Sequence, residues 1–532
     1  MRLLTRSTLP LLAAISLGIF ATGFGGGGSG ELPQEIRAIM EKSRYADATW
    51  ALRVVDLKSG DVIYDLNSDK RLLTGSVRKL YSVGTALNKL GPDDRFKTPV
   101  FRIGEVDASG NLQGNLILVA KGDLTMGGRD CGHDCVAYSD FDHNDANSLG
   151  SAILTTPDPL AGLNKLAAQV AAAGIKTVSG DVIIDDRLFP QFRVPNQKLL
   201  ITPIVINDNR IDVTILPTTP GSSANVEWRP QSAAFEVGNK VTTVAAGEES
   251  KVTLTQENGH EGVVSGTIAV DYVPPLPGVK TLVQTFRTDL ENAPADNAAS
   301  FARTTFIEAL ERAGITVKAK LVAPNPEHKL PSPDAYSAGA MVAELVSAPY
   351  SQYAKLILKV SLNLGANLSL MLFGLANGVN TVQPALAVER TTLVQQYGLN
   401  SNGFNFPTNG SGSPDSEAST ATTVDLLTEM THRKTFPFYF QSLPIFGVDG
   451  SLATVGADSP ARGKIFAKTG TYITLEGEIG AQTLAGYIHA RSGRKLAYSL
   501  FVNNAGTFTG IDAILGVIDD EADISTIIQQ SN

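Results

Sequence analysis

The sequence predicts a mixed α/β (α+β) fold class built around an antiparallel sheet, and three features of the chain lead to this prediction. Strand patterns occur near both ends, helix patterns dominate much of the second half, and residues 202–277 are rich in Pro, Gly, Thr and Val with almost no helix pattern. This middle stretch predicts a separate all-β module. The length of 532 residues is enough for about three domains.

The elements expected in the first half follow from apolar periodicity and from turn residues. A helix is expected over 35–44, then a hairpin over 49–67 whose turn is Lys58-Ser-Gly-Asp61. A second helix is expected over 80–90, because Gly91-Pro92 is a strong helix stop. After about residue 99 the pattern changes to a helix at 159–173 among short strands at 101–104, 115–120 and 180–185.

The second half returns to helix patterns and then ends in strands. A helix is expected over 299–313, and helix patterns dominate residues 338–396. The last part of the chain alternates between apolar and polar residues, and its strands are expected at 463–468, 485–489 and 495–503. A tight turn joins the last two, so we expect them to belong to one antiparallel sheet.

The composition argues against several functional classes. Lys+Arg 44 against Asp+Glu 53 gives a formal net charge of −9, whereas nucleic-acid binding requires a surplus of cationic side chains to neutralise phosphates. Two cysteines and six scattered histidines are too few for a disulfide-rich scaffold or a zinc protein built on several Cys or His ligands. We therefore expect no nucleic-acid partner, no metal and no cofactor.

The first 25 residues have the pattern of a secretory signal peptide. Arg2 and Arg6 precede a short apolar stretch over 9–20, and the small residues Ala21 and Gly23 suit a cleavage site. The apolar stretch is short for a membrane-spanning helix, although an uncleaved membrane anchor is the alternative. We therefore expect export from the cytoplasm.

Ser76 and Lys79 form the first pair of residues that could carry chemistry. A Ser at a helix N-terminus and a Lys three residues later share one helix face, beside free N–H groups that suit a developing oxyanion. A Lys kept neutral by burial or by a cationic neighbour can accept the Ser proton. This SxxK pattern is weak alone, because a second copy, Ser492 to Lys495, lies in a predicted turn.

Lys468, Thr469, Gly470 and Thr471 form the second feature, a KTG tripeptide and a following Thr at the end of a predicted strand. A Gly in a strand lets a ligand approach the edge closely. The ammonium group and the two hydroxyls would then line that edge as an anchor for a carboxylate. An ordinary edge lysine before a turn is the alternative.

Ser361 and Asn363 form an SxN tripeptide among predicted helices, where a hydroxyl and an amide can relay a proton and hold a substrate amide. Another SxN tripeptide, Ser223 to Asn225, lies in the predicted β module. SxxK, SxN and KTG in this chain order are the signature of serine penicillin-recognising enzymes. Further landmarks occur in the same order, at 118–125, 178–186, 206–210, 409–412, 447–450 and 496–503.

With these motifs, the chain from about Trp50 to Asn504 resembles the S13 peptidases, which are class C, low-molecular-mass penicillin-binding proteins with D-alanyl-D-alanine carboxypeptidase/endopeptidase activity. The resemblance implies a penicillin-binding, β-lactamase-like transpeptidase domain over 31–98 and 326–532. A large β-rich insertion of two modules would interrupt it, namely an α+β domain over 99–205 and 278–325 and a β module over 206–277.

The resemblance also implies a role for each site residue. Ser76 would be the acylated nucleophile, Lys79 its general base, Ser361 the proton shuttle to the leaving amine, and Asn363 the group that binds the substrate amide. The terminal carboxylate of the substrate would be bound by the KTG strand, through Lys468, Thr469 and Thr471. Backbone N–H groups of Ser76 and Thr471 would form the oxyanion hole.

The activity that the resemblance implies is hydrolysis of peptidoglycan stem peptides and cross-links in the periplasm through an acyl-serine intermediate, with β-lactams as covalent inhibitors. A β-lactamase-like hydrolase is one alternative, although the 282 residues (361 − 79) between Lys79 and Ser361 are far more than a compact β-lactamase has there. A catalytically weak peptidoglycan-binding scaffold is the other. The sequence leaves open the balance of the two activities and the formation of a homodimer.

Two departures from the family pattern affect the expected rate. The family has Ser-Asp-Asn followed shortly by Ala-Glu, whereas this chain has Leu362 in the middle of the tripeptide and Asn367 at the position of the Glu. Asn409 likewise replaces the Asp of a DGSG loop. The sequence therefore predicts a less acidic surrounding for the same catalytic groups.

The stretch from Cys131 to Cys135, with His133 and His143 nearby, has a spacing that zinc could use. In an oxidising compartment a local disulfide is the expected alternative. The Asp-rich run 140–145 has Asp145 where an EF-hand loop needs Gly, so we expect this run to be a solvated loop.

Overall fold

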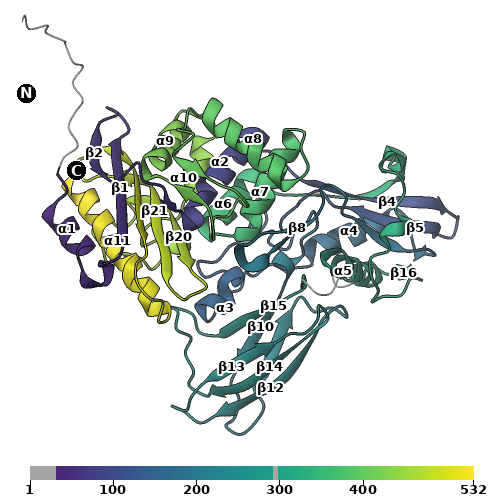
Figure 1. The fold of residues 1–532 in the computed structure, drawn as a ribbon. Coiled ribbons are helices and arrows are strands. Elements are labelled where there is room, and N and C mark those ends of the chain that lie inside the picture. Colours follow the sequence, from purple (N-terminus) through teal and green to yellow (C-terminus); the bar gives the residue numbers. More distant parts are fainter. Residues whose placement is uncertain (1–30, 291–296) are drawn as a thin grey trace, which may run out of the picture.

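The computed structural model describes residues 31–290 and 297–532 (Figure 1). The predicted signal peptide, residues 1–25, lies outside the described residues. No helix within the described ranges is both long enough and apolar enough to cross a membrane.

The two ends of the chain combine in one antiparallel sheet with the strand order β2-β1-β22-β21-β20. This confirms the strands expected near both termini. Because side chains alternate across a strand, Leu52 and Val54 of β1 face one layer, while Ala51 and Val55 face the other. The bounds are β1 (Thr49–Asp56), β2 (Val62–Leu66), β20 (Ile465–Ile473), β21 (Ile479–His489) and β22 (Lys495–Asn503).

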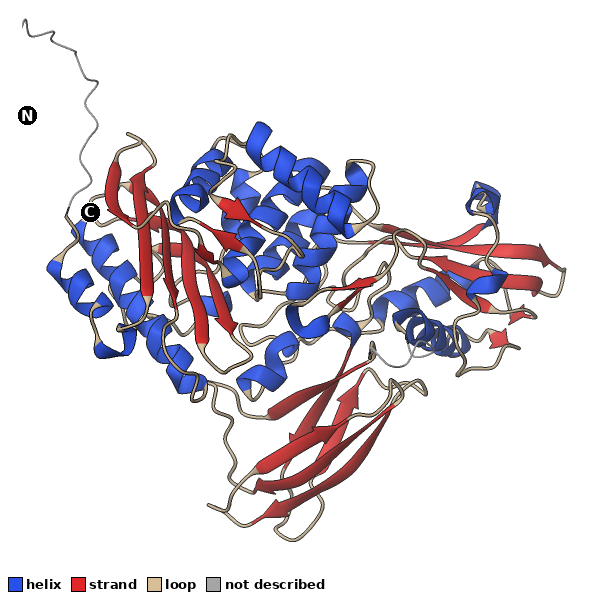
Figure 2. Ribbon diagram, in the orientation of Figure 1, coloured by secondary structure: helices blue, strands red, loops and turns tan. Residues whose placement is uncertain are grey.

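Helices cover both faces of this sheet, as Figure 2 shows. One face packs on the helices at the two chain ends, α1 (Gln34–Met40) and α11 (Ile511–Ser531). The other face packs on a cluster of helices with α2 at its centre (Figure 1). This cluster contains α2 (Lys79–Leu90), α6 (Tyr350–Lys359), α7 (Asn363–Ala376), α8 (Val382–Gln395), α9 (Thr420–Thr431) and α10 (Phe436–Gln441).

A second sheet has the order β16-β6-β5-β4-β17, and β7 also pairs with β5. Residues 341–346 were expected to be helical but form β17, which pairs antiparallel with β4. The helices α4 (Ala161–Ala172) and α5 (Ala298–Arg312) share a core with this sheet. Its strands are β4 (Lys97–Val106), β5 (Asn111–Val119), β6 (Thr177–Val178), β7 (Val182–Asp185), β16 (Thr316–Val317) and β17 (Met341–Val346).

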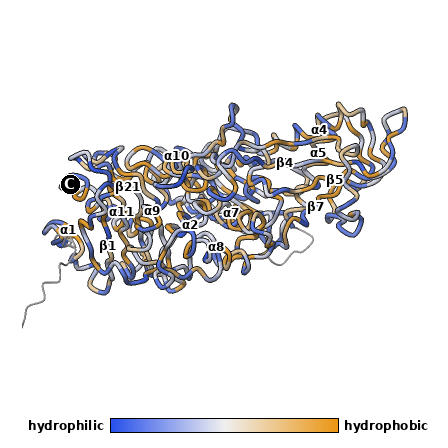
Figure 3. Tube along the Cα trace, turned by 90° about the horizontal axis from the view of Figure 1, so that it is seen from above, coloured by the Kyte–Doolittle hydropathy of each residue, from blue (hydrophilic) through white to orange (hydrophobic). Residues whose placement is uncertain are grey.

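Residues 202–277 contain no α-helix, in agreement with the predicted β-rich insertion. Two small sheets, ordered β11-β10-β15 and β12-β14-β13, make up the module. Because β15 pairs with β10, the module extends beyond residue 277, so the predicted boundary there was wrong. It projects from the lower side of the molecule in Figure 1, and the view from above in Figure 3 places the sheet of β4, β5 and β7 at the end opposite α1. The bounds are β10 (Arg210–Leu216), β11 (Asn225–Arg229), β12 (Glu236–Val244), β13 (Lys251–Thr255), β14 (Glu261–Ala269) and β15 (Leu282–Arg287).

Several short elements lie between these layers. Strands β18, β19 and β3 form a small three-stranded sheet, β8 pairs with β9, and the short helix α3 packs against β15. Their bounds are β3 (Leu72–Leu73), β8 (Phe192–Arg193), β9 (Leu200–Ile201), β18 (Phe404–Asn405), β19 (Glu417–Ala418) and α3 (Ala146–Leu149).

A buried ion pair fixes the start of α2 to α8. The guanidinium of Arg78 donates to both carboxylate oxygens of Glu389, with 3.0 Å for Nη1 to Oε1, and the two side chains are 0% and 1% exposed. The same guanidinium lies 4.0 Å from the ring centroid of Phe406. Removing one partner of such a pair leaves an uncompensated buried charge.

We therefore predict that Glu389→Gln lowers the free energy of unfolding by about 3–5 kcal/mol, measured by urea unfolding followed through circular dichroism. The control is Glu105→Gln, since Glu105 is 94% exposed and its pair with Arg102 is worth about 0–1 kcal/mol. Equal effects of the two substitutions would contradict this account of the buried pair.

Candidate active site

Ser76 lies in the 3-10 turn Gly75–Arg78, which joins β3 to α2 and leaves the Ser76 side chain half-buried. The turn lies directly against β20. A side chain on Gly75, whose φ is +47°, would come within 2.8 Å of the amide nitrogen of Thr471, and one on Gly470 would come within 2.7 Å of the amide nitrogen of Ser76. The two glycines thus bring the N–H groups of Ser76 and Thr471 close together.

Lys79 is fully buried, and its Nζ lies at the meeting point of the motifs. This atom is 2.5 Å from Oγ of Ser76 and 3.4 Å from Oγ of Ser361. It donates to Oδ1 of Asn363 at 2.6 Å and to the carbonyl oxygen of Ser411 at 3.1 Å. Burial, together with the nearby charge of Lys468, holds the pKa of Lys79 well below its usual value, which favours the neutral amine.

Ser361 occupies the turn between α6 and α7 in a left-handed conformation, with φ +61°. The N–H of Leu362 donates to the carbonyl oxygen of Ile357 at 3.0 Å, which is the hydrogen bond of a Schellman helix end. Glycine is the usual residue at this position, and another residue costs about 1–2 kcal/mol there. Asn363 begins α7, so the tight turn places both polar side chains of the SxN tripeptide beside Lys79.

Lys468 is also fully buried, and its Nζ donates to Oγ of Ser361 at 2.8 Å and to the carbonyl oxygen of Thr469 at 2.7 Å. Burial lowers the pKa of Lys468 to about 7, although the carboxylate of Asp145 acts in the opposite direction. The charge of this ammonium group is therefore sensitive to pH near neutrality.

The two threonine hydroxyls of the KTG strand are held by neighbouring side chains. Oγ1 of Thr469 lies 2.8 Å from Oγ of Ser451, and Oγ1 of Thr471 donates to Oε1 of Gln482 at 2.7 Å. Both threonines remain partly exposed, so their hydroxyls line the edge of β20.

The structure thus brings together every side chain that the sequence placed in the site, from SxxK, SxN and KTG. The competing copies lie elsewhere. Ser492 is in the turn between β21 and β22, and Ser223 precedes β11 in the β module.

The two asparagines that depart from the family pattern both use their neutral amides. Asn367 accepts the N–H of Gly410 at 2.8 Å and donates to the carbonyl oxygen of Asn363 at 2.9 Å. Asn409 accepts the N–H of Ser411 at 2.8 Å and donates to the carbonyl oxygen of Ser413 at 3.2 Å. A carboxylate could not make the donated bonds, so each asparagine ties its loop to the site in a way that an ionised acid would not.

Sequence reasoning missed three contributors to the site. The carbonyl oxygen of Ser411 binds Lys79, and Asn196 donates to Oγ of Ser411 at 3.2 Å. The carboxylate of Asp145 opposes the lowering of the pKa of both Lys79 and Lys468. The loop around Ser411 matched a landmark of the family in the sequence, although no role was assigned to Ser411. No motif indicated that Asn196 or Asp145 would lie near the site, because both belong to the long segment between SxxK and SxN.

Asp142, His143 and Asn144 at the centre of the Asp-rich run are buried, so the interpretation of this run as a solvated loop was wrong. Arg129 binds Asp142 and Asp208, and His143 lies between Asp208 and Asp212 at 2.7 and 2.6 Å. Burial alone would lower the pKa of His143, but the two carboxylates outweigh it and raise this pKa to about 9. Ligand atoms of Asp142, His143 and Asp208 lie within 4.8 Å of one another, as in a metal site, yet the guanidinium of Arg129 already supplies the positive charge.

Cys131 and Cys135 form a disulfide, as the sequence predicted. The zinc alternative for this stretch is thereby wrong, since both sulfurs are committed to each other. The loop also carries Asp134, which pairs with Arg95.

The comparisons with known proteins agree with this geometry. A model of the D-Ala-D-Ala carboxypeptidase 3 (S13) family matches residues 32–519. The chain belongs to this family. It is therefore a serine-type peptidase, and the family and enzyme class predicted from the motifs are confirmed.

Two relatives of this S13 chain and one solved structure extend the comparison. The chain is 27% identical over 522 residues to a D-alanyl-D-alanine carboxypeptidase of Actinomadura sp. (strain R39), which covers 93% of this chain and 86% of the relative. It is 23% identical over 475 residues to D-alanyl-D-alanine carboxypeptidase DacB of Haemophilus influenzae, with 85% of each covered. The crystal structure of penicillin binding protein 4 from Haemophilus influenzae is 19% identical, with a TM-score of 0.66, and covers 93% of this chain and 99% of that one. The predicted fold class is thus confirmed.

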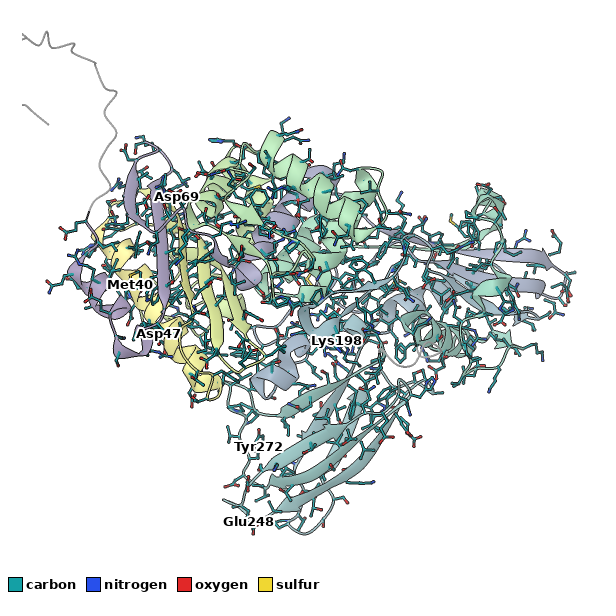
Figure 4. The ribbon with its side chains drawn as sticks, viewed as in Figure 1. Met40, Asp47, Asp69, Lys198, Glu248 and Tyr272 are labelled. Carbon is teal, nitrogen blue, oxygen red and sulfur yellow. A yellow bond between two sulfur atoms is a disulfide. The ribbon has the colours of Figure 1, made fainter. Side chains whose placement is uncertain are left out.

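The pKa of Lys468 leads to a pH prediction. Its cationic form is present below about pH 7, so kcat/KM for a substrate with a terminal carboxylate should fall as the pH rises through 7. Asp145 raises this pKa, so Asp145→Asn should move the decline to lower pH. The control is Asp47→Asn, at an exposed residue near α1 (Figure 4). An unchanged pH profile in Asp145→Asn would contradict the assigned influence of that carboxylate.

Proposed function

We propose that this chain hydrolyses the D-Ala–D-Ala bond of peptidoglycan stem peptides, and the D-Ala–meso-diaminopimelate cross-link, through an acyl-Ser76 intermediate. One observation carries the proposal. Nζ of Lys79 is fully buried, lies 2.5 Å from Oγ of Ser76, and has two carbonyl oxygens, from Asn363 and Ser411, to accept its N–H groups. A neutral amine that donates its two N–H groups to these carbonyl oxygens still has its lone pair available to accept the proton of Ser76.

In the acylation step, Oγ of Ser76 attacks the carbonyl carbon of the penultimate D-Ala as Lys79 takes its proton. The negative charge that develops on the carbonyl oxygen would be stabilised by the N–H groups of Ser76 and Thr471, which the two glycines bring close together. Ser361 lies within 3.4 Å of Lys79 and 2.8 Å of Lys468, a position from which its hydroxyl can pass a proton to the leaving amine. Water then hydrolyses the acyl-enzyme by the reverse proton path.

Substrate binding would use the edge of β20. The ammonium group of Lys468 and the hydroxyls of Thr469 and Thr471 would bind the terminal carboxylate. Since Oδ1 of Asn363 is occupied by Lys79, its Nδ2 remains to donate to the substrate amide. Gly470 is required for this arrangement, because any side chain there would collide with Thr483 and with the turn that carries Ser76.

We also propose the division of the chain and its location. Residues 31–98 and 326–532 would form the catalytic domain, 99–205 with 278–325 the inserted α+β domain, and 206–277 the inserted β module. The sheet shared by both chain ends supports the first assignment. The pairing of β17 with β4 extends the inserted α+β sheet to Val346, and the pairing of β15 with β10 extends the β module to Arg287. The protein would act in the periplasm after removal of residues 1–25, where β-lactams would acylate Ser76. The crystal structure of the Haemophilus influenzae relative with a β-lactam supports the last point.

The test combines a fluorescent penicillin with a purified muropeptide pentapeptide. We predict that the penicillin labels the wild-type protein and not Ser76→Ala, and that the wild type releases D-Ala, detected by mass spectrometry. The control is Ser492→Ala, which alters the competing SxxK copy and should label normally. Labelling that persists in Ser76→Ala would contradict the proposal. Rapid turnover of penicillin would favour a β-lactamase, and cell-wall binding without D-Ala release would favour a scaffold.

A further inference from the structure

Lys359, the last residue of α6, is a buried lysine that forms an ion pair with the partly exposed Asp449, close to Ser361 of the SxN tripeptide. Its side chain is 1% exposed, and its Nζ donates to both carboxylate oxygens of Asp449, at 2.6 and 2.7 Å. Ser361 follows two residues later in the left-handed turn. The ion pair therefore anchors the end of α6, and Ser361 lies in the turn that follows this helix end.

A lysine at this position lowers the stability of the fold relative to an apolar residue. The neighbouring positions of α6 are apolar and buried, and removing an ammonium group from water carries a large free-energy cost that a carboxylate only partly offsets. A buried apolar side chain would pack there without that cost. An ion pair retained in such surroundings suggests a need for a defined geometry.

The loop that carries Asp449 is itself fixed to the active-site strand. Oδ1 of Asp449 accepts the N–H of Ile445 at 2.9 Å, and the N–H of Ala467 in β20 donates to the carbonyl oxygen of Pro444 at 3.0 Å. At the other end of the loop, Oγ of Ser451 lies 2.8 Å from Oγ1 of Thr469. The loop thus follows β20 on both sides of Lys468.

Backbone packing reinforces the same contact. Gly450 has φ +63°, and a side chain on it would lie 2.7 Å from the carbonyl oxygen of Lys359. The N–H of Gly450 donates to Asp140, on the segment that leads from the disulfide to α3. The end of α6, the 444–451 loop and the inserted segment are therefore packed together with no room for a side chain at Gly450.

These contacts close a ring. It runs from Lys359 along the chain to Ser361, across the 2.8 Å hydrogen bond to Lys468, to the adjacent Thr469, and back through Ser451 to Asp449. A break in this ring would free the strained turn at Ser361 to move relative to β20.

We propose that Lys359 and Asp449 are positioning residues, which fix the left-handed turn at Ser361 against β20 so that its hydroxyl stays between Lys79 and Lys468. The inference rests on the proposed function, because it assigns Ser361 the proton transfer to the leaving amine. Neither residue is assigned a contact with the substrate in this mechanism. Their effect should therefore appear in the chemical step more than in substrate binding.

The test compares Lys359→Met, Asp449→Asn and the double variant Lys359→Met/Asp449→Asn. Lys355→Met, one turn earlier on α6, is the matched control, since that lysine is partly exposed over the ring of Tyr138. Release of D-Ala from a pentapeptide gives kcat and KM, the thermal unfolding midpoint gives stability, and stoichiometric penicillin labelling shows that each variant is folded. The double variant carries no unpaired buried charge, so it should recover most of the stability that the single variants lose.

We expect the double variant to have kcat lowered about 10–100-fold with KM changed less than about 3-fold, because a misplaced proton-transfer group slows chemistry without weakening binding. Lys355→Met should match the wild type. Wild-type kcat in the stable double variant would overturn the positioning role and leave the pair a stability feature. That result differs from failure of the proposed function, in which the wild type itself would release no D-Ala.

Discussion

The active site depends on the burial of one amine, Nζ of Lys79. Segments that are far apart in the sequence meet at this atom, since Ser76, Asn363 and the carbonyl of Ser411 all lie within 3.1 Å of it. Burial disfavours the ammonium form, and the second lysine of the site, Lys468, disfavours it further. The same packing that assembles the motifs therefore also favours the protonation state of the amine that the proposed mechanism requires.

Close backbone approach is the second requirement, and the chain meets it with unusual local conformations. Gly75 and Gly470 let the Ser76 turn lie against β20, and Ser361 adopts a conformation that glycine would occupy at lower cost. A serine at that position contributes a hydroxyl that glycine lacks. The surrounding ion pairs, Arg78 with Glu389 and Lys359 with Asp449, hold the helix ends on which these turns depend.

Local patterns predicted the parts of the fold and site that depend on nearby residues. The terminal strands, the hairpin of β1 and β2, and the order of SxxK, SxN and KTG were all visible in the sequence. Residues 341–346 were missed as a strand because Met, Ala, Glu and Leu favour helices, whereas pairing with β4, far away in the chain, decides the outcome. The burial of Asp142 and His143 likewise depends on residues elsewhere in the chain, namely Arg129, Asp208 and Asp212, which local patterns do not reveal. The approach of Asp145 to Lys79 is also set by the fold and not by neighbouring residues. Asn367 and Asn409 appeared as departures, but only their hydrogen bonds explain why a neutral amide fits there.

The central claim is that Lys79 acts as a neutral base, and the rate of Ser76 acylation by a penicillin in Lys79→Arg tests it most directly. Arginine retains a positive charge and hydrogen-bond donors near Asn363 and Ser411, but its guanidinium remains protonated at all accessible pH values and cannot accept the Ser76 proton. The account predicts acylation slower by about 10²–10⁴-fold in a folded variant. Acylation at close to the wild-type rate would contradict it.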